Sequence, residues 1–151
     1  MSVVTLHYLT VQDVLWINQE VTKQQNDFKY AQLEEATYFQ YGYGQSTDVI
    51  EQAGRFLQGF LKMRPFTEGN RATAFVAALT FLYMNGYMST LSPESALQWV
   101  LSIADKKVDG KTAVASIAVP SEEPPNLHPP VRSIVHEVIE TYADAVANLT
   151  D

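Results

Sequence analysis

The most constraining feature of this sequence is a predicted helix that has no polar face. Residues 72–84 contain no glycine or proline, and only two threonines interrupt their apolar character. One stripe at helical spacing is formed by Phe75, Ala78, Leu79 and Leu82. The remaining faces carry Val76, Ala77, Phe81 and Tyr83. Because a helix that is apolar all round must be surrounded by protein, the sequence predicts a bundle built around this segment, which should end at Asn85-Gly86.

The loop before this helix has the features of an anion-binding site. Asn70 is expected to cap the helix, because its side-chain oxygen can accept a first-turn N–H. The free N–H groups and the helix dipole attract negative charge, Gly69 allows close approach, and Arg64 and Arg71 add positive charge. Glu68 can help phosphates to hold magnesium. The residues alone leave two interpretations open: a phosphate site, or a capped core helix with solvated charges around it.

The overall composition narrows the possible functions. The 151 residues, 46% of them hydrophobic, are enough for one domain with a core. A net charge of -7 argues against a face that binds nucleic acid. The absence of cysteine excludes disulfides and thiolate chemistry. The N-terminus lacks the pattern of a signal peptide and no apolar run is long enough to span a bilayer, so we expect a cytoplasmic protein without a membrane partner.

Other segments supply the rest of the predicted bundle. Apolar residues recur at helical spacing in three segments before the central helix: 11–22, 30–41 and 48–62. Gly54 and Gly59 lower the stability of the third segment but allow close helix packing. Ser92-Pro93-Glu94 predicts another helix start, and residues 111–119 form either a shorter helix or an irregular packed segment. Together these elements predict an all-α domain over residues 1–119.

A proline-rich stretch precedes the C-terminal part of the chain. Residues 120–130 contain five of the seven prolines and are predicted to be a stiff linker. Residues 131–149 then carry apolar side chains at helical spacing over about five turns, which predicts an amphipathic helix within residues 131–151. This helix must bury its apolar face, either on its own core or on a second copy of the chain in a homodimer.

The stretch around Gly69 resembles the signature of the Fic/Doc (death-on-curing) family, written H-P-F-x-[D/E]-G-N-[K/G]-R-T. The matching residues are Pro65, Phe66, Glu68, Gly69, Asn70 and Thr73. The similarity is Doc-like and covers roughly residues 9–118. It implies a Fic/Doc-like helical bundle with an additional C-terminal helix, and ATP with magnesium as cofactors. It also implies that Glu68 contacts the metal and that the phosphates are bound by Gly69, Asn70, Arg71 and Thr73.

Two positions depart from this signature. Arg64 stands where the family has its catalytic histidine, and Ala72 stands where the family has its second basic residue, which binds phosphate. A guanidinium stays protonated and has no acceptor lone pair, so Arg64 cannot act as a general base. The resemblance and these departures together indicate a catalytically impaired Doc/Fic-like protein of toxin–antitoxin type that retains a phosphate or nucleotide pocket.

Two alternatives remain open at this point. The chain could be an active Doc-like toxin that moves phosphate or AMP from ATP onto the hydroxyl of a protein target and is neutralised by an antitoxin. It could instead be a non-catalytic interaction protein that uses the helix in residues 131–151.

Overall fold

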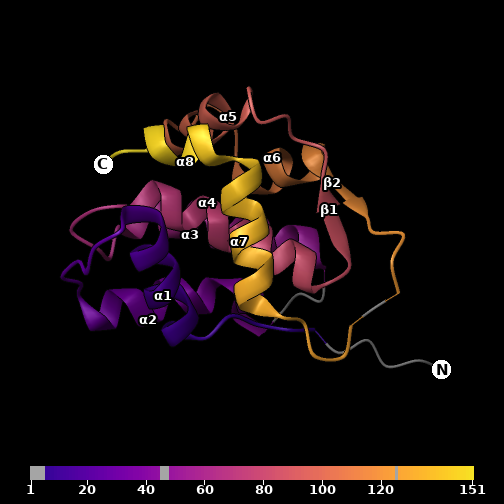
Figure 1. Ribbon diagram of the computed structural model, residues 1–151, viewed down its shortest axis with the longest axis horizontal. Helices are drawn as coiled ribbons and strands as arrows, with labels where there is room; N and C mark the ends of the chain where they lie inside the picture. Colours follow the sequence, from indigo (N-terminus) through magenta and orange to yellow (C-terminus); the bar gives the residue numbers. More distant parts are fainter. Residues whose placement is uncertain (1–5, 45–47, 125) are drawn as a thin grey trace.

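A computed structural model of the chain describes residues 6–44, 48–124 and 126–151. Within these ranges the chain forms eight α-helices, one 3-10 helix and two short strands (Figure 1). The elements before the central helix are α1 (Val11–Thr22), α2 (Tyr30–Tyr38), η1 (Phe39–Gly44) and α3 (Val49–Met63). The later ones are α4 (Asn70–Met84), β1 (Tyr87–Ser89), α5 (Ala96–Ala104), α6 (Gly110–Ile117), β2 (Ala118–Pro120), α7 (Val131–Thr141) and α8 (Ala143–Asn148).

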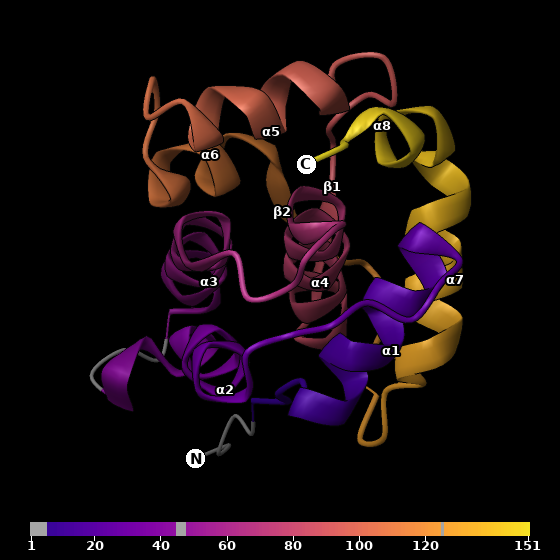
Figure 2. The ribbon, with the colours of Figure 1, turned by 90° about the vertical axis from the view of Figure 1, so that its left-hand side faces the viewer.

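Helix α4 is the buried centre of the bundle. Figure 2 looks nearly along this helix and shows α3, α1, α7 and the pair α5 and α6 arranged around it. Every residue of α4 except Arg71 and Tyr83 is buried. Because its apolar side chains face outward in all directions, each neighbouring helix packs an apolar stripe against it. The predicted all-α fold built on this segment is confirmed.

Helix α1 lies beside the start of α4 and helps to shape the loop there. Thr10 caps α1 through a capping box, in which its hydroxyl accepts from the Asp13 N–H and the Asp13 carboxylate accepts from the Thr10 N–H. Val14, Ile17 and Asn18 are the buried residues of α1. The polar side chain of Asn18 is therefore held in the interior of the bundle.

Two predictions for the segment between α4 and the proline-rich stretch differ from the structure. Helix α5 begins at Ala96 instead of at Pro93, because the Ser95 N–H donates to the Ser92 carbonyl oxygen at 3.1 Å and forms a turn. The second difference is a pair of antiparallel strands, β1 and β2, in which Met88 lies opposite Val119. The chain leaves α6 in an extended conformation at Ala118, so the last residues of that predicted segment pair with β1 instead of continuing the helix.

The C-terminal helices pack on the same core as the rest of the chain. The predicted helix over residues 131–149 is divided into α7 and α8 at Tyr142, whose ring turns inward and is only 2% exposed. Val135 and Val138 of α7 and Leu149 after α8 are buried in the core cluster. Of the two locations predicted for this apolar face, the structure shows the chain's own core.

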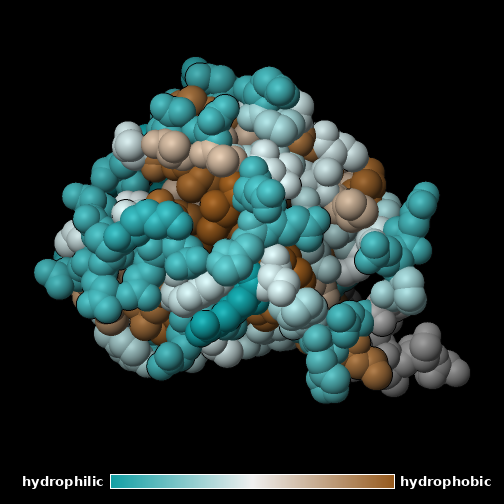
Figure 3. Space-filling view, in the orientation of Figure 1, coloured by the Kyte–Doolittle hydropathy of each residue, from teal (hydrophilic) through white to brown (hydrophobic). Residues whose placement is uncertain are grey.

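The surface around these helices is mostly polar. In Figure 3, hydrophilic residues cover most of the face shown, and hydrophobic residues gather beside α7 and below α8. Among the helices that the structure describes, none combines the length and the hydropathy needed to cross a membrane.

Candidate anion-binding site

The backbone at the start of α4 is shaped by a glycine and an asparagine. Gly69 is the N-cap residue and has a φ of 79°, a left-handed conformation that glycine adopts at little cost. The predicted capping role of Asn70 is wrong, because its side chain instead closes the preceding loop. Its Oδ1 accepts from the Phe66 N–H at 2.9 Å, and its Nδ2 donates to the Phe66 carbonyl oxygen at 2.8 Å. A Cβ at Gly69 would stand 2.3 Å from Cγ2 of Thr22, so packing against α1 also requires glycine here.

Helix α1 holds this loop through Asn18. The Nδ2 of Asn18 donates to the Glu68 carbonyl oxygen at 2.9 Å and to the Thr73 hydroxyl at 3.1 Å. The Oδ1 of Asn18 accepts from Nδ2 of Asn26 at 2.9 Å. An isolated β-bridge between Phe28 and Phe66 fixes the other side of the loop. The first turn of α4 therefore presents its N–H groups from a rigid support.

The carboxylate of Asp151 lies at this helix N-terminus. The Asn70 N–H donates to Oδ2 of Asp151 at 3.1 Å, and Nη2 of Arg64 lies 3.6 Å from the same oxygen. The side chain of Asp151 is 1% exposed, whereas that of Arg64 is 48% exposed. A carboxylate oxygen is a charged acceptor, as a phosphate oxygen is. The geometry predicted to bind an anion is therefore engaged by an anion that the chain itself supplies.

The predicted site residues do not all lie at this point. Arg64 follows α3 in a left-handed conformation, with a φ of 50°, and its guanidinium reaches Asp151. Arg71 is partly exposed in the first turn of α4. Thr73 is 0% exposed, and its hydroxyl faces Asn18 in the core. The structure thus brings Arg64, Gly69 and Asn70 together, while Thr73 supports the loop from beneath.

Glu68 is the predicted metal ligand. Its side chain is exposed, and Oε2 accepts a hydrogen bond from Nε2 of Gln24 at 2.7 Å. The described residues contain no group of three or more histidine, aspartate or glutamate side chains that could hold a metal ion. One carboxylate is too few for a metal site built by the protein alone, so Glu68 fits only a magnesium ion whose other ligands are phosphates and water.

Two residues of the site were missed by sequence reasoning. Asn18 had a signal, because it follows Val14 by four positions and therefore lies on the buried face of its helix. Asp151 had none, because it is 81 positions from Asn70 and belongs to no motif. Only the fold of α7 and α8 brings its carboxylate to α4.

Comparison with known proteins gives one match. The model of the Fic/DOC family matches residues 8–82. This range holds α1, α2, η1, α3 and most of α4, and it includes every residue of the site described above except Asp151. No curated protein and no solved structure matches the chain significantly.

Proposed function

Because the chain belongs to the Fic/DOC family, we propose that it is a catalytically impaired Fic/Doc-like protein of toxin–antitoxin type. We propose further that the N-terminus of α4 binds a phosphate group, either free or as part of a nucleotide such as ATP. An antitoxin or a target protein would be its macromolecular partner.

The side chains at two positions account for the proposed impairment. Arg64 carries a cation at the place of the family's general base, and its guanidinium already faces the Asp151 carboxylate at 3.6 Å. A permanently protonated group cannot take a proton from a hydroxyl. Ala72 is 2% exposed and offers no charge to a phosphate. Loss of a general base alone slows such reactions by about 10²–10⁴-fold.

The phosphate site rests on one observation, which is the hydrogen bond from the Asn70 N–H to the Asp151 carboxylate. It supports the view that the helix dipole, the first-turn amide and Arg64 act together on negative charge. In this proposal the Asp151 oxygen stands in for a phosphate oxygen. The two groups compete, so a phosphate binds only when the side chain of Asp151 moves away.

The hydrogen bonds and the ion pair of Asp151 only partly offset the cost of burying its carboxylate. This makes an exchange with phosphate feasible. Its Oδ1 is buried and has no hydrogen-bond partner among the described residues. Its Oδ2 has one amide donor, and the ion pair to Arg64 is long. Burial of a carboxylate is costly unless hydrogen bonds satisfy both oxygens. A phosphate carries more charge and more acceptor oxygens, and it can recruit Arg71 as well as Arg64.

We predict that Asp151→Asn strengthens phosphate binding. The substitution keeps the size of the side chain but removes its competing charge, and we expect the affinity for inorganic phosphate and ATP to rise about tenfold, the effect of losing one charge-assisted contact. Isothermal titration calorimetry with phosphate, AMP and ATP measures the change. Asp144→Asn is the matched control, because Asp144 lies exposed on α8 and the net charge changes equally.

The binding measurements distinguish two parts of this proposal, the existence of the phosphate site and the competition of Asp151 for it. Arg64→Ala and Arg71→Ala should each weaken phosphate binding in the Asp151→Asn background. If neither the wild-type chain nor Asp151→Asn binds any of the three anions, the phosphate site does not exist. If Asp144→Asn raises the affinity as much as Asp151→Asn does, the effect is one of net charge, and Asp151 does not compete for the site.

A transfer assay tests the impairment. The chain is incubated with magnesium, a cell extract and ATP labelled in either the α- or the γ-phosphate, and we expect no labelled protein. Label that disappears on Glu68→Ala would replace the proposal with an active transferase. Glu68 is the better test position, because its side chain is exposed, whereas Asn70 holds the loop together.

A further inference from the structure

Exposed aromatic side chains are concentrated on one part of the surface. The described residues include seven exposed large apolar side chains, and four of these lie within residues 28–41. Three of the four are tyrosines of α2 and η1: Tyr30 is 60% exposed, Tyr38 is 52% exposed and Tyr41 is 38% exposed. Large apolar patches that stay exposed mark sites of protein–protein interaction, so this part of the surface is a candidate for one.

The spacing of residues along α2 explains how these rings come together. Tyr30, Glu34 and Tyr38 are four positions apart, so they share one stripe of the helix. Leu33 lies on the other side of α2 and is buried in the core. Tyr41 of η1 continues the stripe, because its ring meets that of Tyr38 edge to face with the centroids 5.9 Å apart. We call the four residues Tyr30, Glu34, Tyr38 and Tyr41 the tyrosine face.

The end of this face near η1 is held in place by the core. The ring of Tyr41 stacks on that of Tyr8, with the centroids 4.0 Å apart. Tyr8 in turn meets the buried ring of Phe81 in α4, with the centroids 5.9 Å apart. Rings that are already fixed lose little conformational entropy when a partner binds, so this part of the face is prepared for an interaction.

The tyrosine face carries negative charge and no positive charge. Residues 30–41 include Glu34 and Glu35 but no lysine, arginine or histidine. Within the described part of the chain, neither carboxylate takes part in an ion pair. The negative charge of Glu34 is the main cause that raises the pKa of Tyr30, and Tyr38 makes a smaller contribution. A cation at this face would therefore meet a carboxylate together with the electron-rich faces of aromatic rings.

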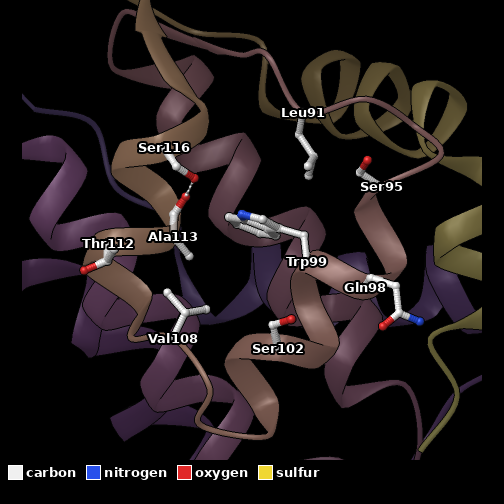
Figure 4. Close-up of a pocket in the computed structure, with 9 residues that line it drawn as sticks. All are labelled: Leu91, Ser95, Gln98, Trp99, Ser102, Val108, Thr112, Ala113 and Ser116. Carbon is white, nitrogen blue, oxygen red and sulfur yellow. Dashed lines mark hydrogen bonds between the residues drawn. The ribbon is translucent and has the colours of Figure 1, made fainter.

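The shape of the face favours a chain segment over a small molecule. Figure 2 shows α2 at the edge of the bundle, so its outer side is convex. Sites for small molecules are concave, and the groove between α5 and α6 in Figure 4 has no lining residue from α2 or η1. Along the helix, Tyr30 and Tyr38 are separated by about 12 Å at 1.5 Å per residue. Only a partner that extends over this length can meet Glu34 and all three rings.

We propose that the tyrosine face binds a segment of a partner protein that presents arginine side chains. A guanidinium is planar, stacks on aromatic rings and pairs with carboxylates, whereas a lysine ammonium has no plane to stack. The net charge of -7 on the chain favours the approach of a basic segment. The candidate anion site at Asn70 and Asp151 includes none of these four residues, so binding at the tyrosine face does not require phosphate.

The length of the face sets the spacing of the arginines. An extended segment rises about 3.3 Å per residue, and side chains four positions apart point to the same side of it. Two arginines at this spacing would lie about as far apart as Tyr30 and Tyr38. One guanidinium would then stack between Tyr38 and Tyr41, and the other would pair with Glu34 beside Tyr30.

The probe is a peptide with two arginines at this spacing, Ac-Gly-Arg-Gly-Ser-Gly-Arg-Gly-amide. In protein labelled with ¹³C in its tyrosine rings, we expect the added peptide to move the ring resonances of Tyr30, Tyr38 and Tyr41. Those of Tyr142 should stay in place, because this ring is buried. Citrulline in place of both arginines keeps the shape of the side chains without their charge, and that peptide should bind too weakly to move the rings. The affinity for the arginine peptide should fall as the salt concentration rises.

Two pairs of variants test the carboxylate and the ring separately. Glu34→Gln should raise the dissociation constant of the arginine peptide about threefold, the usual effect of one exposed ion pair. Glu94→Gln changes the net charge equally at an exposed position before α5 and should leave the affinity unchanged. Tyr38→Leu keeps an apolar side chain without the ring and should also weaken binding about threefold. Tyr38→Phe keeps the ring and should bind as the unchanged chain does. Circular dichroism checks that each variant is folded.

Several results would overturn the proposal. It fails if the arginine peptide moves none of the three rings up to its solubility limit, or if the citrulline peptide moves them equally. An equal loss of affinity in Glu94→Gln and Glu34→Gln would show an attraction to net charge alone, without a role for this face. Unchanged binding in Tyr38→Leu would show that the peptide does not stack on the tyrosine face.

Discussion

Replacing Tyr142 with alanine is expected to lower the free energy of unfolding by about 3–5 kcal/mol, the usual cost of removing a large buried ring. Tyr142 joins the C-terminal helices to the rest of the bundle. Its ring meets Phe75 of α4 edge to face with centroids 5.2 Å apart, and its hydroxyl donates to the Leu91 carbonyl oxygen at 2.8 Å. The substitution opens a cavity against α4 and leaves that carbonyl without its donor. Urea unfolding followed by circular dichroism measures the change.

Tyr142→Phe is the control for this prediction. It keeps the ring and removes only the hydroxyl, so the expected loss is about 1–2 kcal/mol. The difference between the two variants then reports the packing of the ring against Phe75. If both variants unfold at the same urea concentration, the ring contributes little and the C-terminal helices are held by other contacts.

Gly54→Ala is expected to destabilise the chain by about 2 kcal/mol, even though alanine is the better helix former. A Cβ at Gly54 would stand 2.6 Å from the backbone N and Cα of Lys111 in α6. The obstacle is backbone, so no side chain can rotate away and α3 and α6 must separate. This loss exceeds the gain of about 0.5–1 kcal/mol from helix propensity. The midpoint of urea unfolding should fall while the slope stays constant.

Gly59→Ala on the same helix is the matched control. A Cβ at Gly59 would meet the ring of Phe39, 2.3 Å away at its nearest atom. A ring can turn aside where a backbone cannot, so we expect at most half the loss seen for Gly54→Ala. Equal losses for the two variants would show that the approach of α3 to α6 does not set the cost.

Most of the fold was predicted from the spacing of apolar residues at helical periodicity. The apolar run of residues 72–84 could only be a buried helix, and the stripe of the segment that became α3 was equally clear. The residues at which helices begin and end were less predictable. Ser92-Pro93-Glu94 has the residues of a helix start, yet a hydrogen-bonded turn forms there and α5 begins at Ala96. The local signal for a turn is similar to that for a first helical turn, and packing decides between them.

The candidate site was predicted in part. The sequence identified Arg64, Gly69 and Asn70 as neighbours at a helix N-terminus, but it assigned the cap to Asn70. The hydrogen bonds between Asn70 and Phe66 span only four residues, yet they depend on the loop being closed by α1. The sequence motif therefore located the site, and the tertiary contacts set the role of each side chain.

The sequence by itself determined the central helix, the all-α class and the lack of a proton acceptor in the Arg64 side chain, because each follows from local periodicity or from the chemistry of one side chain. Only the tertiary structure decided which anion meets the amide of Asn70 and which ring packs against Tyr142. Those contacts join residues that are distant along the chain, and their energies depend on burial and geometry that no local pattern encodes. For this reason Asp151, a residue without any sequence signal, became the closest charged partner of the predicted site.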